Sequence, residues 1–254
     1  MPAPRLLFVH AHPDDEALWT GGLLARHMAG GGDADLVMCT WAVGTPRHRE
    51  LLDSVRELGL PRPPIMLGYA DDRVPESAPD AEPFCAARFD SLVRTMATHI
   101  RRLRPDAVVT YDAIGIYGHP DHVHAHRLAV AAVDAAASPR LYRSAGPAWQ
   151  TRSIYFVTIP DWMADDVSDD VFAAVPRDLL PGTPISDIDL TLDVGPWCDR
   201  KSAAIAAHRT EFERSRTIQA LMALPTERRT RLLSSENFIR RDLVAGGVNL
   251  CRVD

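Results

Sequence analysis

The sequence predicts a doubly wound α/β fold with a mostly parallel sheet and a less regular C-terminal part. In the first 137 residues, short apolar runs alternate with longer segments of helical character. The apolar runs are continuous, as expected of parallel strands that are buried on both faces. Strict alternation of strand and helix is typical of a parallel sheet covered by helices.

The expected elements of this half have clear boundaries. Acidic residues open the first helix, where the helix dipole favours them, and Gly59 and Pro105 end the second and third helices. The expected strands are Arg5–His10 (RLLFVH), Asp35–Thr40, Pro64–Leu67 and Asp106–Thr110. The expected helices are Asp15–Met28, Arg47–Leu58, Arg88–Arg104 and the alanine-rich Asp121–Ala137.

The second half is less regular, although we expect residues 1–254 to form one domain. The expected strands are Ser153–Ile159 and Ile188–Val194, and the expected helices are Asp199–Arg209 and Thr226–Ser235. Asp161–Pro184 is rich in Asp and Pro and is expected to loop over one sheet edge. Ala70–Pro83 is a long polar loop, and such loops in compact domains are often functional.

Composition excludes several classes of function. The net charge is −6 without a basic block, which argues against nucleic-acid binding. No apolar run approaches the roughly 20 residues of a membrane span, and the N-terminus does not resemble a signal peptide. The four cysteines are scattered without a CxxC pair, so we expect reduced thiols in a cytoplasmic protein.

Two clusters of histidines and acids follow two of the expected strands. Phe8–Glu16 (FVHAHPDDE) follows the first strand, and Tyr117–His126 (YGHPDHVHAH) follows the fourth. Ligands of open α/β sheets bind beyond the carboxyl ends of strands, where strand order reverses. The first and fourth strands are neighbours there in the commonest arrangement, so we expect the clusters to form one site.

The residue types suit a divalent metal. Imidazole and carboxylate together fit zinc, and also iron, manganese or nickel. The spacing does not choose between Asp14 and Asp15 as the free carboxylate, or between His122 and His126 as a ligand. HPDDE alone could instead be a helix N-cap, and histidines of the second cluster could lie on a helix surface. Two clusters at paired strand ends favour the metal site.

At these residues the chain resembles a known family. Ala11–Glu16 (AHPDDE) and Tyr117–His122 (YGHPDH) resemble the motifs of the GlcNAc deacetylases of the LmbE-like group, which includes phosphatidylinositol-glycan (PIG-L) deacetylases and the mycothiol enzymes. Weaker matches are Arg47-x-x-Glu50, Gly68-Tyr-x-Asp71 and Lys201-x6-His208-x-x-Glu211. The resemblance implies a Rossmann-like fold.

The resemblance also implies roles for individual residues. Zinc, with iron(II) as an alternative, would be held by His12, Asp15 and His122. Asp14 would be the base that takes a proton from the attacking water. Tyr117 would donate to the oxyanion, and His119, oriented by Asp121, would stabilise the tetrahedral intermediate. Arg47 and Asp71 would bind substrate, although Arg47 could be a solvated helix-end charge and Asp72 could replace Asp71.

The implied reaction is hydrolysis of an N-acetyl group on a small amino-sugar substrate, without nucleic acid or membrane; a homo-oligomer is compatible with it. A close alternative is an amidase that removes a larger acyl group from a mycothiol-type conjugate or a natural-product intermediate. Other classes are a metal-dependent phosphoesterase and a non-catalytic sugar-binding module. A nicotinamide-dependent enzyme is disfavoured, because no GxGxxG follows the first strand. The family often has Gln where this chain has Glu211, and the Ala70–Pro83 loop has its own composition, so the substrate is open.

Overall fold

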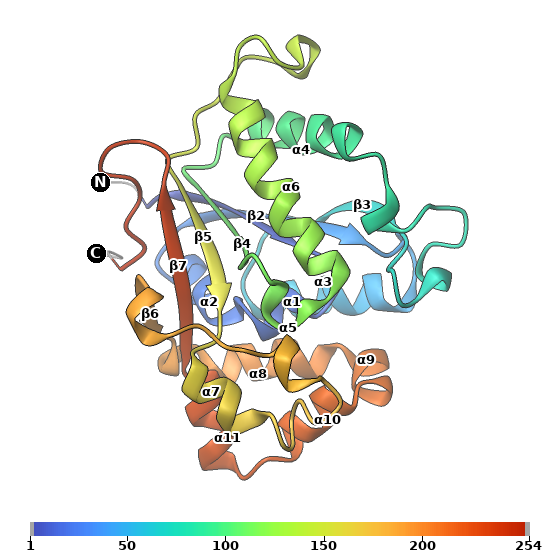
Figure 1. Cartoon of the computed structure of the whole chain (residues 1–254), viewed down its shortest axis with the longest axis vertical. Coiled ribbons are helices and arrows are strands. Elements are labelled where there is room, and N and C mark those ends of the chain that lie inside the picture. The colour runs from blue at the N-terminus through green and yellow to red at the C-terminus, as the bar shows by residue number, and fades with distance from the viewer. Residues whose placement is uncertain (1–2, 252–254) are drawn as a thin grey trace.

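The computed structural model of the chain describes residues 3–251. A single sheet of seven strands, in the order β3-β2-β1-β4-β5-β7-β6, forms its centre (Figure 1). The strands are β1 (Arg5–His10), β2 (Asp33–Thr40), β3 (Ile65–Tyr69), β4 (Ala107–Tyr111), β5 (Ser153–Thr158), β6 (Leu190–Asp193) and β7 (Ser235–Asp242). The strands β1 to β5 run parallel, whereas β7 is antiparallel to both β5 and β6. The mostly parallel α/β sheet expected from the sequence is confirmed.

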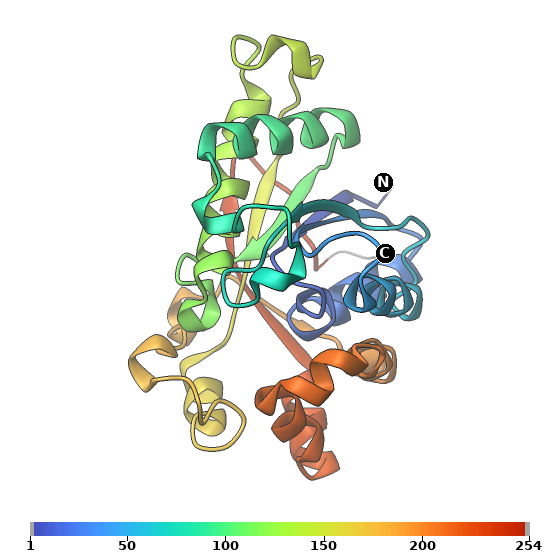
Figure 2. The ribbon, with the colours of Figure 1, turned by 90° about the vertical axis from the view of Figure 1, so that its right-hand side faces the viewer.

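Helices cover both faces of the sheet. The α-helices are α1 (Asp15–Leu18), α2 (Gly21–Ala29), α3 (Pro46–Glu57), α4 (Phe89–Leu103), α5 (Gly115–Gly118), α6 (Pro120–Ala137), α7 (Asp161–Val167), α8 (Cys198–Ala207), α9 (Arg209–Arg214), α10 (Arg216–Ala223) and α11 (Thr226–Leu233). Figure 2 shows α4 and α6 on one side of the sheet and α2 and α3 on the other. Within residues 3–251 no helix combines the length and apolar character that crossing a membrane requires.

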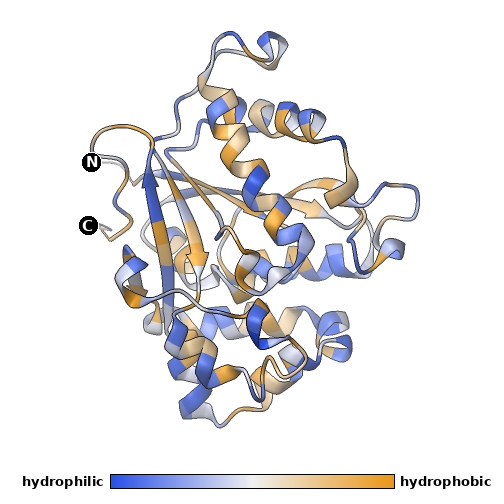
Figure 3. Ribbon diagram, in the orientation of Figure 1, coloured by the Kyte–Doolittle hydropathy of each residue, from blue (hydrophilic) through white to orange (hydrophobic). Residues whose placement is uncertain are grey.

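The central strands owe their burial to their uninterrupted apolar sequences. Leu6, Leu7, Phe8 and Val9 of β1 have no exposed surface, as both faces of the strand are covered. The antiparallel end of the sheet differs: β7, between β5 and β6, carries polar residues and is partly exposed, in contrast to the apolar β5 (Figure 3). Continuous apolar runs therefore mark the parallel centre of the sheet, as expected.

The expectation of one helix over Asp15–Met28 is wrong, because the segment divides into α1 and α2. Gly22, in the first turn of α2, packs so closely on Val194 that a Cβ at this glycine would lie 2.5 Å from the Val194 Cβ. The Glu236 carboxylate of β7 accepts the N–H groups of Gly22 and Leu23 at 2.7 and 2.8 Å. These remote contacts satisfy the unpaired donors of a new helix N-terminus.

The C-terminal half also departs from expectation. Asp161–Pro184 was expected to be a loop, yet it begins with α7, whose residues Met163, Ala164 and Val167 are buried. The strand β7 and the helices α9 and α10 were not expected at all. The helices α7, α10 and α11 gather beyond the carboxyl end of β5, below the sheet in Figure 1. They form one wall of the region where the functional site lies.

Candidate active site

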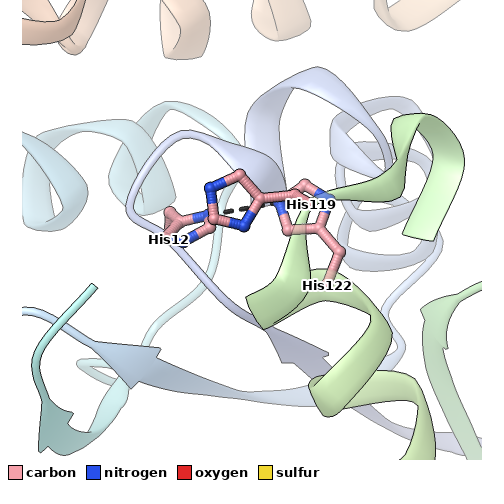
Figure 4. A group of neighbouring side chains, drawn as sticks. All are labelled: His12, His119 and His122. Atoms are coloured by element: carbon pink, nitrogen blue, oxygen red, sulfur yellow. Dashed lines mark hydrogen bonds between the residues drawn. The ribbon is translucent and has the colours of Figure 1, made fainter. Parts of the chain in front are cut away.

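The two histidine clusters meet, because β1 and β4 are adjacent. Leu6 pairs with Ala107, so both strands present their carboxyl ends at one edge. The ring centroids of His12 and His122 are 5.1 Å apart, and those of His12 and His119 are 4.5 Å apart. Figure 4 shows the three imidazoles converging, His12 from the loop after β1 and the other two from the start of α6.

Ligand-type atoms of His12, Asp15 and His122 have the spacing of a zinc site. His12 Nδ1 lies 3.1 Å from His122 Nε2. The Asp15 carboxylate lies 3.3 Å from each of these nitrogens, through Oδ2 to His12 and Oδ1 to His122. Ligands about 2.0–2.1 Å from a tetrahedral zinc lie about 3.3–3.4 Å from one another. The three residues therefore fit one such ion with a position left open.

The charges around His12 also favour a cation. Burial by itself lowers the pKa of His12, but the carboxylates of Asp121, Asp15 and Asp71 raise it well above its ordinary value. Burial by itself would raise the pKa of Asp15, but the imidazoles of His122 and His12 hold it well below the usual range. The raised pKa of His12 reports the negative charge of the surrounding carboxylates, which also favours a bound cation, and the lowered pKa of Asp15 keeps its carboxylate ionised.

Other groupings of ligand atoms overlap this one. His12, His119 and His122 offer nitrogens within 4.8 Å of one another, and so do ligand atoms of His12, Asp71, His119 and Asp121. One ring nitrogen of His119 already has a partner: its Nδ1 accepts the backbone N–H of Asp121 at 3.2 Å and so caps α6. The Asp121 carboxylate contacts His12 Nε2 at 3.2 Å and accepts the Asp72 N–H at 2.9 Å. It faces His12 rather than the His119 ring.

Two aromatic residues hold Asp15 in place. The Tyr111 hydroxyl donates to Asp15 Oδ2 at 2.6 Å and accepts the Ala11 N–H at 2.7 Å, and its ring stacks on His122 at 4.2 Å. Burial raises the pKa of Tyr111, which keeps the hydroxyl protonated as a donor. Trp19 donates from Nε1 to Asp15 Oδ1 at 3.0 Å. Sequence reasoning missed Tyr111, although its place at the end of β4 was a usable signal.

Asp14 stands apart from this group and faces Arg47. The backbone φ of Asp14 is 129°, a strained value for a residue with a side chain. Arg47 Nη2 lies 3.1 Å from Asp14 Oδ2, and Arg47 Nη1 lies 3.0 Å from Glu211 Oε2. Burial raises the pKa of Asp14 well above its ordinary value, against the lowering effect of Arg47. The Arg47 guanidinium also covers the Trp41 ring at 4.6 Å.

A buried acid beneath the loop fixes the backbone of Asp14. The Glu16 carboxylate accepts the Asp14 N–H at 3.0 Å and contacts His208 Nε2 at 2.7 Å, and Ser54 donates to it as well. Glu16 and His208 have no exposed surface. The two residues thus support the loop that carries Asp14.

A cavity of roughly 300 Å³ opens onto these groups. It is lined by the sequence-predicted residues His12, Asp14, Asp15, Arg47, Asp71, Tyr117 and His119. Asp71 Oδ2 lies 3.5 Å from His12 Nε2, whereas Asp72 is not among the lining residues. Arg47 is 3% exposed, so it is not a solvated helix-end charge. Asp121 and His122 lie behind the cavity wall.

The fold and the site define a Rossmann-like α/β protein with a cluster of histidines and aspartates that could hold a metal ion, beside the separate carboxylate of Asp14. The family model described as "PIG-L: GlcNAc-PI de-N-acetylase" matches residues 7–133. The chain belongs to this family, and it is a hydrolase of the deacetylase class.

Named relatives support the assignment. A 1D-myo-inositol 2-acetamido-2-deoxy-alpha-D-glucopyranoside deacetylase of Rhodococcus jostii is 36% identical over 83% of this chain and 82% of its own length. Among solved structures, a conserved protein of Thermus thermophilus matches with a TM-score of 0.66 at 23% identity, over 98% of both chains. An N,N′-diacetylchitobiose deacetylase of Pyrococcus horikoshii matches with a TM-score of 0.65 at 17% identity, over 94% of this chain and 84% of its own. These two structures support the fold alone.

Proposed function

We propose that this protein is a zinc-dependent hydrolase that removes the N-acetyl group from a GlcNAc-containing small molecule, with a GlcNAc-inositol as the first candidate. One observation carries the proposal: the strained Asp14 lines the same cavity as His12 and Asp15, and these two residues and His122 behind the cavity wall have the spacing of a zinc site. The inositol glycoside is suggested by the name of the Rhodococcus relative.

His12, Asp15 and His122 would hold the zinc, and iron(II) suits the same donors. When bound, the ion would activate a water for attack at neutral pH and polarise the amide carbonyl. Tyr111 and Trp19 keep the Asp15 carboxylate oriented toward the two imidazoles.

Asp14 would take the proton of the attacking water and pass it to the leaving amine. General acid–base catalysis of this kind contributes about 10²–10⁴-fold. A base with a raised pKa is suited to both halves of that transfer, since it gives the proton up as readily as it takes it. Glu16 supports this role by fixing the Asp14 backbone.

Tyr117 and His119 would stabilise the developing oxyanion. Burial raises the pKa of Tyr117, so its hydroxyl stays protonated and can donate. Burial lowers the pKa of His119, and His12 and His122 add to this effect, so the ring is neutral. Because His119 Nδ1 accepts the Asp121 N–H, the ring carries its proton on Nε2. Asp121 thus orients His119 through its backbone rather than its carboxylate.

Arg47 and Asp71, which both line the cavity, would contact the sugar. The residues of α9 and α10 that close the cavity come from the C-terminal part of the chain, which supports treating residues 1–254 as one deacetylase domain. Scattered free cysteines support a cytoplasmic location for the reaction.

The test is to incubate the zinc-loaded protein with GlcNAc-inositol and a panel of N-acyl glucosaminides and to measure free amine and carboxylate. We expect equimolar amine and acetate from N-acetyl substrates. Hydrolysis only of larger acyl groups would support the amidase alternative. Cleavage of a phosphate ester instead, with two metals per chain, would replace the proposal with a phosphoesterase. Sugar binding without turnover would replace it with a binding module.

A further inference from the structure

A second cavity, of roughly 90 Å³, adjoins the first. It lies among α7, α10, α11 and the carboxyl end of β5, in the lower part of Figure 1. Its apolar lining consists of Leu18, Trp19, Val157, Ile159, Met163, Val167, Val171, Phe172, Ile218, Leu221, Leu232 and Leu233. None of the roles derived above for the reaction uses this space.

The two cavities share a wall. Leu18, Trp19, Phe172, Thr217 and Ile218 line both of them. Trp19 stacks on Phe172 with the ring centroids 6.4 Å apart, and Tyr117 lies 5.8 Å from Phe172. Since Trp19 also donates to Asp15, this aromatic wall stands directly between a metal-ligating carboxylate and the apolar cavity. An alkyl group that extends from the reaction centre past Trp19 and Phe172 would reach the second cavity, because these residues line both cavities.

The buried polar residues of the second cavity are already satisfied by the protein. Lys201 Nζ donates to Glu236 at 2.6 Å, and Glu236 accepts the N–H groups that begin α2. Thr158 donates to Asp112 at 2.7 Å, and the Asn237 side-chain oxygen accepts from Thr191 at 2.8 Å. None of these groups needs a polar ligand. The cavity is suited to an apolar occupant.

The volume limits the size of that occupant. A water takes about 30 Å³ of liquid, and an apolar cavity of about 150 Å³ binds benzene. Because a methylene is comparable in size to a water, the cavity has space for about three or four carbons. A long fatty chain does not fit within it.

We propose that this apolar cavity, defined by the twelve residues above, binds a short alkyl group of the substrate during the deacylation reaction. The proposal rests on the proposed function, because it takes the occupant to be part of an N-acylated amino sugar. Such a group has two sources: the acyl chain on the nitrogen, or an aglycone on the glycosidic oxygen. Either group would reach the cavity past the same lining residues, Trp19 and Phe172.

The experiment compares two ligand series. One varies the N-acyl chain of methyl glucosaminide from acetyl to octanoyl, and the other varies the O-alkyl chain of N-acetylglucosaminides from methyl to octyl. Affinity for the zinc-loaded protein is measured by calorimetry, and kcat/KM is measured where turnover occurs. We expect a gain in only one of the two series, the one whose chain enters the cavity. In that series the affinity should rise about threefold to fourfold per methylene over about three or four carbons and then level off.

Variants that fill the cavity test whether the alkyl chain binds there. Leu221→Trp, from α10, and Val167→Phe, from α7, are independent ways to occupy the space, and each is first checked for an unchanged unfolding midpoint. Met222→Trp is the matched control, because Met222 is adjacent on α10 but is not among the lining residues. We expect the chain-length gain to disappear in both filled variants and to persist in the control.

The outcomes separate cleanly. A gain in the acyl series assigns the cavity to the acyl chain, and a gain in the glycoside series assigns it to the aglycone; either supports the proposal. No gain in both series overturns it, as does a gain that survives both filled variants. If the protein hydrolyses no N-acyl sugar at all, the proposed function fails, while the calorimetric series still shows whether the cavity binds alkyl groups.

Discussion

Arg47 Nη2 lies 3.1 Å from Asp14 Oδ2, so the buried guanidinium is paired with the carboxylate proposed as the base. The same guanidinium contacts Glu211, whose charge acts on Asp14 in the opposite sense. Arg47 lowers the pKa of Asp14, whereas Glu211 raises it. Arg47, which the family resemblance implies as a substrate contact, therefore also lowers the pKa of the proposed base.

Replacing Arg47 should move the acidic limb of the pH profile. A base acts only when deprotonated, so activity falls as the pH drops through its pKa. In Arg47→Met the pKa of Asp14 loses its main lowering influence, and the acidic limb of kcat/KM should shift to higher pH. Glu211→Gln should shift it to lower pH, and the exposed Arg49→Met on α3 is the control. Shifts of equal sign in both variants would contradict this electrostatic account.

Asp14→Asn should abolish nearly all turnover and leave zinc binding intact. Asparagine cannot accept the proton, so kcat should fall by about 10²–10⁴-fold. Asp14 is outside the group of His12, Asp15 and His122, so the zinc content should match the wild type. The control is Asp53→Asn, an exposed acid paired with Arg56. Normal turnover in Asp14→Asn would remove Asp14 from the mechanism.

His12→Ala and His122→Ala should each lower bound zinc sharply. Each variant removes one of the three proposed protein ligands, and two remaining donors would be insufficient for a stable zinc site. Elemental analysis after dialysis measures the metal, and His99→Ala on α4 is the control. The same measurement on His119→Ala tests whether His119, rather than Asp15, belongs with His12 and His122 in the ligand set. Full occupancy without His122, combined with loss of zinc without His119, would show that the ligand set is different.

The sequence could predict the meeting of the two clusters because both depend on local patterns. Apolar runs identify β1 and β4, and the ligands follow each run directly. Parallel pairing then places both loops at one edge, which is a property of the fold class rather than of particular contacts.

What the sequence could not predict depends on contacts between remote residues. The break before α2 is fixed by Glu236 and Val194, over 170 residues away. The strand β7 (SENFIRRD) has little apolar character of its own, and it forms because it pairs with β5 and β6. Likewise, Arg47 of α3 pairs with Glu211 of α9, and no local sequence pattern predicts a contact between these two helices.

Tyr111→Phe should weaken metal binding without removing any ligand. The hydroxyl donates to Asp15 at 2.6 Å, and its loss leaves that carboxylate less firmly oriented. Loss of such a supporting partner typically costs about 10–100-fold in metal affinity. Competition with a chromogenic zinc chelator measures the change. Tyr155→Phe is the matched control, since the Tyr155 hydroxyl bonds the Val248 carbonyl far from the site; an equal loss in both variants would indicate general destabilisation.

Glu16 and His208 should contribute stability that depends on pH. Burial by itself would raise the pKa of Glu16, but His208, Ser54 and the Asp14 N–H lower it below its ordinary value. A carboxyl with a depressed folded-state pKa stabilises the fold above its unfolded pKa, about 4.3, and this stability is lost as the pH falls through the folded pKa. Glu16→Gln should therefore lower the free energy of unfolding by about 1–3 kcal/mol at pH 7. The difference from the wild type should shrink progressively below about pH 4.3.

Urea unfolding of the zinc-free protein between pH 3 and pH 8 measures this difference, with Glu57→Gln, an exposed acid of α3, as the control. Because Glu16 also fixes the Asp14 backbone, the variant should lose kcat with little change in KM. His208→Gln removes the imidazole but leaves the Glu16 bond to Asp14, so it should destabilise the protein and spare more of kcat. A destabilisation of Glu16→Gln that is the same at every pH would show that packing, not the Glu16 charge, stabilises this part of the loop.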